Sequence, residues 1–248
     1  MNARFHAPDA RAPGEEIALP AEEGRHLTRV LRLDVGDDVR VFDGRGHEFA
    51  ARVTQVERDS VRVRLEEACQ AAREASVAVS LAQAVLKGDR MDDVVRDAVM
   101  MGVAAIQPIV TTRTEVSLAT LARGARRERW ERVAIASAKQ CGRAMVPPVR
   151  EPVALDAFLS SLAAARDGLV LMLVEPSAGE AAVPLSSLEP EPPREATLLV
   201  GPEGGWTAEE IAAVAPVCRL VSLGGRTLRA DTMALVAMAA LFSRWGEY

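Results

Sequence analysis

The sequence predicts an α/β protein in two parts, a small antiparallel β domain followed by a larger domain with a mainly parallel sheet. Short runs within residues 40–66 alternate apolar and polar side chains, as half-buried strands do. From Val77 onward, apolar strand segments alternate with helical segments, which is typical of α/β domains. The polar, alanine-rich stretch 68–76 separates the two patterns and is typical of a linker. We therefore place the domains at residues 1–70 and 74–248.

Three short strands are expected in the first domain, at residues 39–42, 49–53 and 60–65. The sequence Asp43-Gly44-Arg45-Gly46 between the first two indicates a hairpin turn. Alternation with a period of two buries one face of each strand and leaves arginines on the other. A small antiparallel barrel would satisfy this pattern.

The second domain is expected to contain buried strands and helices in alternation. The strands are predicted at residues 77–81, 105–110, 169–174, 197–200 and 220–222, and the helices at 91–101, 126–141, 208–215 and after residue 222. The proline-rich segment 189–194 is predicted to be an exposed loop.

The composition favours a folded protein outside the membrane. Hydrophobic residues make up 49% of the chain and charged residues 26%, which argues against disorder. No apolar run approaches the roughly 18 uncharged residues of a membrane span, and the polar start Met1 to Arg4 lacks the apolar stretch of a signal peptide. We therefore expect a cytoplasmic protein. A net charge of -5 argues against indiscriminate coating of nucleic acid, although local basic patches remain compatible with it.

Potential metal ligands are scattered. The three cysteines and three histidines show no paired ligand spacing, and the odd number of cysteines does not suit a disulfide framework. These residues are Cys69, Cys141, Cys218, His6, His26 and His47. We expect no metal site.

Two glycine-containing loops carry most of the functional information. The first, Gly201 to Gly205, follows a buried strand, and Thr207 to Glu210 then form a capping box that begins a helix. The second, Leu223 to Arg229, follows the next strand. Two such loops side by side would form one pocket at the carboxyl ends of the sheet strands. Neither loop is GxGxxG or a P-loop, so a nicotinamide dehydrogenase or a nucleotide hydrolase is not indicated.

The GPEGG run at 201–205 and the LGxRxLR run at 223–229 resemble the 16S rRNA (uracil-N3)-methyltransferase family of the SPOUT superfamily. The resemblance extends over nearly the whole chain and includes Lys87 to Met91 and Gln140 to Arg143. It implies an N-terminal PUA-like β-barrel and a C-terminal SPOUT α/β domain with a deep trefoil knot. It also implies S-adenosylmethionine-dependent methylation of N3 of a specific uridine in 16S rRNA of the small ribosomal subunit.

By this resemblance, one group of residues would bind S-adenosylmethionine: Leu173, Leu199, Gly201, Gly205, Leu223, Gly224, Leu228 and Thr232. Arg229 would act in catalysis by stabilising charge on the uracil carbonyl oxygens. The alternative for Arg229 is an ion pair with Asp231 or Glu203.

Five arginines are expected to contact RNA. Arg25, Arg29 and Arg32 fall at i, i+4 and i+7 of a predicted helix whose other side carries Leu27, Val30 and Leu31. A solvated face neutralised by Glu22 and Glu23 is the alternative. Arg113 and Arg143 belong to a second, looser basic set suited to contacts with the RNA backbone.

A homodimer is expected, because knotted methyltransferases generally place the target base where two subunits meet. The apolar last helix, Ala234 to Phe242, could form that interface or be a buried core helix.

Two other functions stay open. One is a SPOUT methyltransferase that acts on a ribose 2'-oxygen or another base of RNA. The other is a noncatalytic RNA-binding ribosome-assembly protein, because the helix at Asp97 to Gly102 lacks the lysine and glutamate usual in the family.

Overall fold

The computed structural model describes residues 3–58, 60–165, 168–176 and 182–247. The chain forms two compact units. Unit 1 comprises Met1–Glu74 and Ile135–Val146, and unit 2 comprises Ala75–Ala134 and Pro147–Tyr248. The segment 135–146, which the sequence pattern placed in the second domain, therefore belongs to unit 1.

Unit 1 is built on a five-stranded sheet in the order β1-β3-β4-β5-β2. The strands are β1 (Arg4–His6), β2 (Glu16–Ala18), β3 (Asp38–Phe42), β4 (Glu48–Val56) and β5 (Val61–Cys69). The three predicted strands are confirmed as the antiparallel neighbours β3, β4 and β5. The short β1 pairs parallel to β3. The inward residues of these strands form a core with Phe5, Val41 and Leu65 fully buried, as the period-two pattern predicts.

The predicted helix around Arg25 to Arg32 has a different geometry. Helix α1 (Ala21–Arg25) continues into a π-helical segment, η1 (His26–Leu31), and Arg32 ends it in the left-handed conformation with φ 57°. A π-helix has a wider turn than an α-helix, so the spacing i, i+4, i+7 no longer defines one stripe. Of the three apolar residues placed opposite the arginines, Leu27 is buried, but Val30 is 66% exposed and Leu31 40% exposed. They therefore do not form one buried side.

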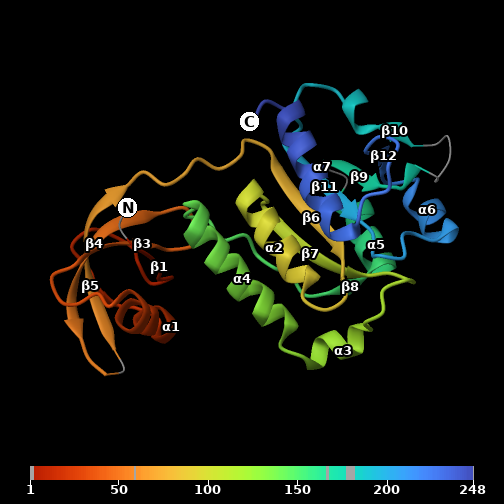
Figure 1. Cartoon of the computed structure of the whole chain (residues 1–248). Helices are drawn as coiled ribbons and strands as arrows, with labels where there is room; N and C mark the ends of the chain where they lie inside the picture. Colours follow the sequence, from red (N-terminus) through yellow and green to blue (C-terminus); the bar gives the residue numbers. More distant parts are fainter. Residues whose placement is uncertain (1–2, 59, 166–167, 177–181, 248) are drawn as a thin grey trace. The chain divides into compact units, whose positions relative to one another are not determined.

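Unit 2 contains a seven-stranded sheet in the order β10-β12-β9-β11-β6-β7-β8 (Figure 1). The strands are β6 (Ala78–Ala84), β7 (Ala105–Val110), β8 (Val153–Ala154), β9 (Leu169–Leu173), β10 (Val183–Pro184), β11 (Glu195–Val200) and β12 (Arg219–Ser222). Neighbouring strands all pair parallel, which confirms the predicted parallel sheet. Their carboxyl ends therefore lie at one edge of the sheet, the edge where open α/β folds bind ligands.

Helices connect and follow these strands along the chain. They are α2 (Arg90–Met101), α3 (Leu118–Arg123), α4 (Arg126–Cys141), α5 (Leu155–Ala165), α6 (Ala208–Val214) and α7 (Ala230–Arg244), with a short 3₁₀ helix η3 (Leu185–Ser187). Helices α2 and α7 pack against each other (Figure 1). The apolar residues of α7 are buried: Ala234, Ala237, Met238, Leu241 and Phe242 are at most 2% exposed. This finding favours a core helix over an interface strip at 234–242.

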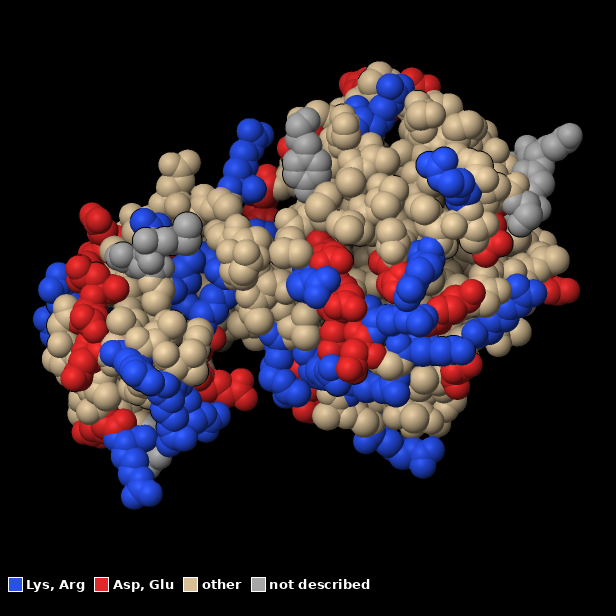
Figure 2. Space-filling model, viewed as in Figure 1, with Lys and Arg blue, Asp and Glu red and all other residues tan. Residues whose placement is uncertain are grey.

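The charged surface of unit 2 is mixed in sign. Figure 2 shows basic and acidic side chains interspersed on the face that carries α2. Ion pairs account for this arrangement: Arg129 pairs with Asp92, and Arg96 with Asp93 and Asp97. Such exposed pairs contribute little to stability, but they neutralise arginines that would otherwise attract anions.

The carboxyl end of α4 lies in unit 1, where the Arg4 guanidinium binds it. Helix ends leave carbonyl groups without partners, and Arg4 satisfies several of them. Its nitrogens donate to the carbonyl oxygens of Ala138, Lys139, Gly142 and Arg143 at 2.7–3.2 Å. The same guanidinium pairs with the buried carboxylate of Glu48 at 2.8 Å. Arg4 therefore joins the first strand of unit 1 to the segment 135–146.

Within the described residues, none of the helices combines the length and the apolar character that a membrane crossing requires.

Candidate active site

A pocket of about 320 Å³ opens at the carboxyl end of the parallel sheet in unit 2. Its walls come from the loop 200–206 after β11, the segment 227–231 before and at the start of α7, the end of β9, and the start of α2. Both glycine-containing loops were expected to border one pocket. The structure confirms the first loop as a wall and brings the end of the second, Thr227 to Arg229, to the same pocket.

Two glycines of the first loop are required for different physical reasons. A Cβ atom on Gly201 would lie 3.0 Å from the Trp206 indole, too close for any ordinary contact. Gly205 has φ +68°, a conformation that side chains disfavour, and a Cβ there would lie 3.2 Å from Oε1 of Glu175. The backbone at both positions is therefore open to the pocket only because no side chain is present.

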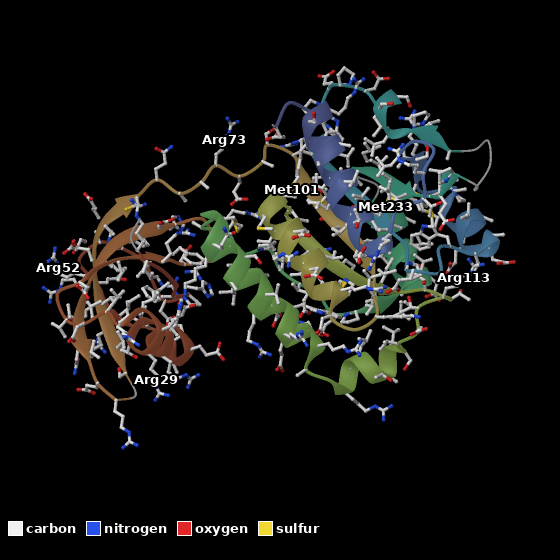
Figure 3. All side chains as sticks on the ribbon, viewed as in Figure 1. Arg29, Arg52, Arg73, Met101, Arg113 and Met233 are labelled. Atoms are coloured by element: carbon white, nitrogen blue, oxygen red, sulfur yellow. The ribbon has the colours of Figure 1, made fainter. Side chains whose placement is uncertain are left out.

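Trp206 fixes the loop against the neighbouring strand. Its Nε1 donates a hydrogen bond of 2.8 Å to the carbonyl oxygen of Leu173, at the end of β9. On the other side, Nη1 of Arg113 donates to the carbonyl oxygens of Gly204 and Trp206 at 2.7 and 3.1 Å. Arg113, labelled in Figure 3, follows β7, so the loop is tied to both sides of the sheet edge.

Helix α6 begins directly after this loop with the predicted capping box. The Thr207 hydroxyl accepts a hydrogen bond from the backbone of Glu210, and the Glu210 carboxylate accepts one from the backbone of Thr207. The other carboxylate oxygen of Glu210 accepts from the backbone N–H of Thr112 at 2.7 Å. The start of α6 is thereby fixed relative to the end of β7.

Acidic and basic side chains alternate across the pocket and form hydrogen bonds and ion pairs. Oε1 of Glu203 accepts hydrogen bonds from the backbone N–H of Lys87 at 3.0 Å and from Nη1 of Arg90 at 3.2 Å. Nε of Arg90 lies 4.0 Å from Oδ2 of Asp231, which also accepts a hydrogen bond of 2.9 Å from Nη2 of Arg229. The Arg229 side chain is 68% exposed. Burial alone would raise the pKa of Asp231, but the hydrogen bond and the positive charge of Arg229 lower it overall.

The carboxylate of Glu175 differs from these paired groups. It follows β9 and lines the pocket beside Gly205. Among the described residues it has neither a hydrogen-bond partner nor an ion-pair partner. The pocket therefore contains two carboxylates paired with arginines and one that has no partner among the described residues.

The structure places the predicted cofactor residues in three kinds of position. Leu173, Gly201, Gly205 and Leu228 line the pocket, as does Arg229. Leu199 is fully buried in the core beneath it, packed with α5. The remaining residues, Leu223, Gly224 and Thr232, do not belong to its lining, and the Thr232 hydroxyl donates to Asp231 at 3.3 Å.

Sequence reasoning missed Arg90, Glu175, Trp206 and Asp231 as pocket residues. A signal existed for Glu175, because an acidic residue directly after a buried strand of a parallel sheet lies at the ligand-binding edge. Arg90 lies in the segment 87–91, which carries part of the family resemblance. No pattern in this segment indicates that the Arg90 side chain borders the pocket.

The five arginines predicted to contact RNA lie at separate places in the structure. In unit 1, Arg25 and Arg29 border a hollow of about 260 Å³, and Figure 3 labels Arg29 there. Arg32 is exposed. Arg143 is 5% exposed, and its guanidinium pairs with Glu74. This burial removes Arg143 from the surface that RNA could contact.

Among the described residues, no three His, Cys, Asp or Glu side chains form a cluster that could hold a metal ion.

Comparison with known proteins identifies the domains. A family described as RNA methyltransferase domain matches residues 73–242, and one described as RNA methyltransferase PUA domain matches residues 19–66. Ribosomal RNA small subunit methyltransferase E of Synechocystis is 34% identical over 230 residues, which cover 91% of this chain and 72% of the relative.

Two solved structures are similar over nearly the full chain. Ribosomal RNA small subunit methyltransferase E from Neisseria gonorrhoeae, bound to S-adenosyl methionine, is 31% identical with a TM-score of 0.87, covering 99% of this chain and 98% of that one. A putative methyltransferase from Legionella pneumophila in complex with S-adenosylmethionine is 33% identical with a TM-score of 0.88, covering 98% of each chain.

Proposed function

Because the chain belongs to the RNA methyltransferase family, whose members include ribosomal RNA small subunit methyltransferase E, we propose that it methylates 16S ribosomal RNA. The methyl donor is S-adenosylmethionine. The observation that carries this proposal is the pocket at the carboxyl end of the parallel sheet, bordered by the GPEGG loop and the segment before α7. Proteins of the same fold, more than 30% identical, hold S-adenosylmethionine.

The pocket residues fit this cofactor. The volume of about 320 Å³ lies at the lower end of the usual range for ligand sites. Leu173 and Leu228 supply apolar walls for a purine, and the bare backbone at Gly201 and Gly205 allows close approach of polar ligand atoms. When bound, the cofactor supplies a methyl group that its sulfonium makes electrophilic.

We propose N3 of a uridine as the acceptor, with Arg229 as the catalytic residue. N3 of uracil carries a proton at neutral pH, and its loss spreads negative charge onto the two carbonyl oxygens. One N–H group of Arg229 is bound to Asp231, while the side chain remains 68% exposed at the pocket. Its remaining donors can therefore face the uracil oxygens. Asp231 acts as a positioning residue that holds one side of the guanidinium.

RNA binding is proposed for both units. Arg25, Arg29 and Arg32 on unit 1 are exposed and would contact phosphates. Arg113 would act near the pocket, although its guanidinium is already engaged by the GPEGG loop. We further propose a homodimer, a cytoplasmic location and a deep trefoil knot in the SPOUT domain. We propose domains at residues 1–70 and 74–248, with the segment 135–146 of the second packed into the first compact unit. Sedimentation at micromolar concentration tests the dimer, because a monomer alone would contradict it.

The decisive experiment is mass mapping of 16S rRNA from a strain that lacks this enzyme, with and without the chain. The expected result is one uridine that gains a methyl group only when the chain is present. Nucleoside digestion then separates methylation at N3 from methylation at the ribose 2'-oxygen or another base. An unmethylated RNA, with S-adenosylmethionine binding absent in calorimetry, would favour a noncatalytic RNA-binding assembly protein.

A further inference from the structure

Glu175 occupies a special position in the sheet. Strand β9, which precedes it, lies between β12 and β11. These two neighbours lead into the two glycine-containing loops. The Glu175 carboxylate therefore lies between the loops that border the pocket, and its Oε1 is 3.2 Å from the position that a Cβ atom on Gly205 would occupy.

The pocket has an excess of negative charge because of this residue. Glu203 is paired with Arg90, and Asp231 with Arg229. Within the described part of the chain, no cation pairs with Glu175, since the nearby Arg113 donates to backbone carbonyl oxygens instead. An unpaired carboxylate in a pocket attracts a cation more strongly than a neutral molecule of the same shape.

The substrate and the product of methyl transfer differ by one charge. S-adenosylmethionine contains a sulfonium, whereas S-adenosylhomocysteine contains a neutral thioether. Both share the adenine, the ribose, the ammonium and the carboxylate. A protein group that interacts only with the sulfonium therefore raises the affinity for the substrate over that for the product. A group that binds a shared part raises both affinities equally.

We propose that Glu175 is the residue that favours the charged methyl donor over the neutral product, through the attraction between its free carboxylate and the sulfonium. This inference rests on the proposed function. Its consequence is weaker product inhibition: after transfer, the pocket holds a molecule that has lost its attraction to Glu175, and the product dissociates more readily. Because Glu175 is exposed, solvent screens the attraction, and we expect a contribution of roughly fivefold in relative affinity.

Calorimetry on the full chain tests this proposal with three probes: S-adenosylmethionine, S-adenosylhomocysteine, and an analogue in which a carbon that bears a primary ammonium replaces the methylated sulfur. In Glu175→Gln, affinity for the two cations should fall roughly fivefold, while affinity for S-adenosylhomocysteine stays unchanged. The matched control is Glu209→Gln, which removes the same charge on α6 outside the lining of this pocket. It should leave all three affinities unchanged.

The possible outcomes are distinguishable. Equal losses for all three probes would overturn the proposal and assign Glu175 to a shared part, such as the ribose hydroxyls. Unchanged affinities would overturn it as well. In both cases S-adenosylmethionine still binds, so the proposed function stands. If the unsubstituted chain binds none of the probes while its thermal unfolding is cooperative, the proposed function itself fails.

Discussion

The indole nitrogen of Trp206 donates a hydrogen bond of 2.8 Å to the carbonyl oxygen of Leu173, and both groups are buried. Leu173 ends strand β9, and Trp206 ends the GPEGG loop that follows β11. The bond therefore fixes the loop relative to the neighbouring strand and keeps the indole beneath Gly201, where a Cβ atom would collide with it.

Replacing Trp206 with Phe should weaken both stability and cofactor binding. The ring volume is mostly retained, but the Leu173 carbonyl loses its partner in a buried site, which costs about 1–3 kcal/mol. Denaturant unfolding measures the stability change, and calorimetry with S-adenosylmethionine measures the affinity. A variant with unchanged affinity would show that the bond does not hold the loop in its binding conformation.

Gly205→Val should abolish S-adenosylmethionine binding without unfolding the chain. Gly205 has φ +68°, and the added side chain would enter the space beside Glu175. The control is Gly225→Ala in the second loop, because a Cβ there meets open space and the φ angle is not in the left-handed region. Calorimetry and thermal unfolding should show intact folding in both variants and lost binding in the first only.

Arg229→Ala should separate binding from chemistry. S-adenosylmethionine affinity should stay within a few-fold, while single-turnover methyl transfer falls on the order of 100-fold to 1,000-fold. Arg229→Lys should recover little, since a point charge does not reproduce the planar fork. A higher pH should partly rescue the alanine variant, because more of the uracil N3 proton is then removed by solvent. Parallel loss of binding and transfer would make Arg229 a cofactor-binding residue instead of a catalytic one.

The ion pair between Asp231 and Arg229 should make a small, acid-sensitive contribution to stability. The pKa of Asp231 is lowered in the folded chain, so the contribution is present above the ordinary pKa of an aspartate. It is lost as the pH falls through the lowered value. Because Arg229 is mostly exposed, we expect less than about 1 kcal/mol. Unfolding of Asp231→Asn and the unsubstituted chain should differ at pH 7 and converge in acid, and a constant difference would refute the linkage.

Arg4→Ala should be among the most damaging changes in unit 1. It removes the donors for the last carbonyl groups of α4 and the main partner of the buried Glu48. Breaking a buried pair from one side costs about 3–5 kcal/mol. The control is Arg62→Ala, whose solvent-exposed pair with Glu16 should contribute little to stability. Similar unfolding midpoints for the two variants would contradict the role assigned to Arg4.

The sequence predicts the parallel sheet and the first glycine loop well, because their signals are local. Apolar runs, glycines and the capping box at Thr207 each act over a few neighbouring residues. The π-helix at His26–Leu31 was missed because the spacing of Arg25, Arg29 and Arg32 was read with α-helical periodicity. The place of Glu175 beside Gly205 depends on the strand order, which the residues near Glu175 do not encode.

Arg4 and its carbonyl partner on Ala138 are 134 residues apart in sequence. During synthesis on a ribosome, the first strand therefore emerges long before the helix end that it binds. Residues 75–134 of the intervening chain belong to unit 2, so unit 1 is closed by a segment that is made after the first strands and helices of unit 2. Closing so long a loop costs conformational entropy, which slows the step. Contacts between residues this far apart in sequence therefore form late in folding. The N-terminal unit is thus first in the sequence, but it cannot be completed until the chain has been made as far as residue 146.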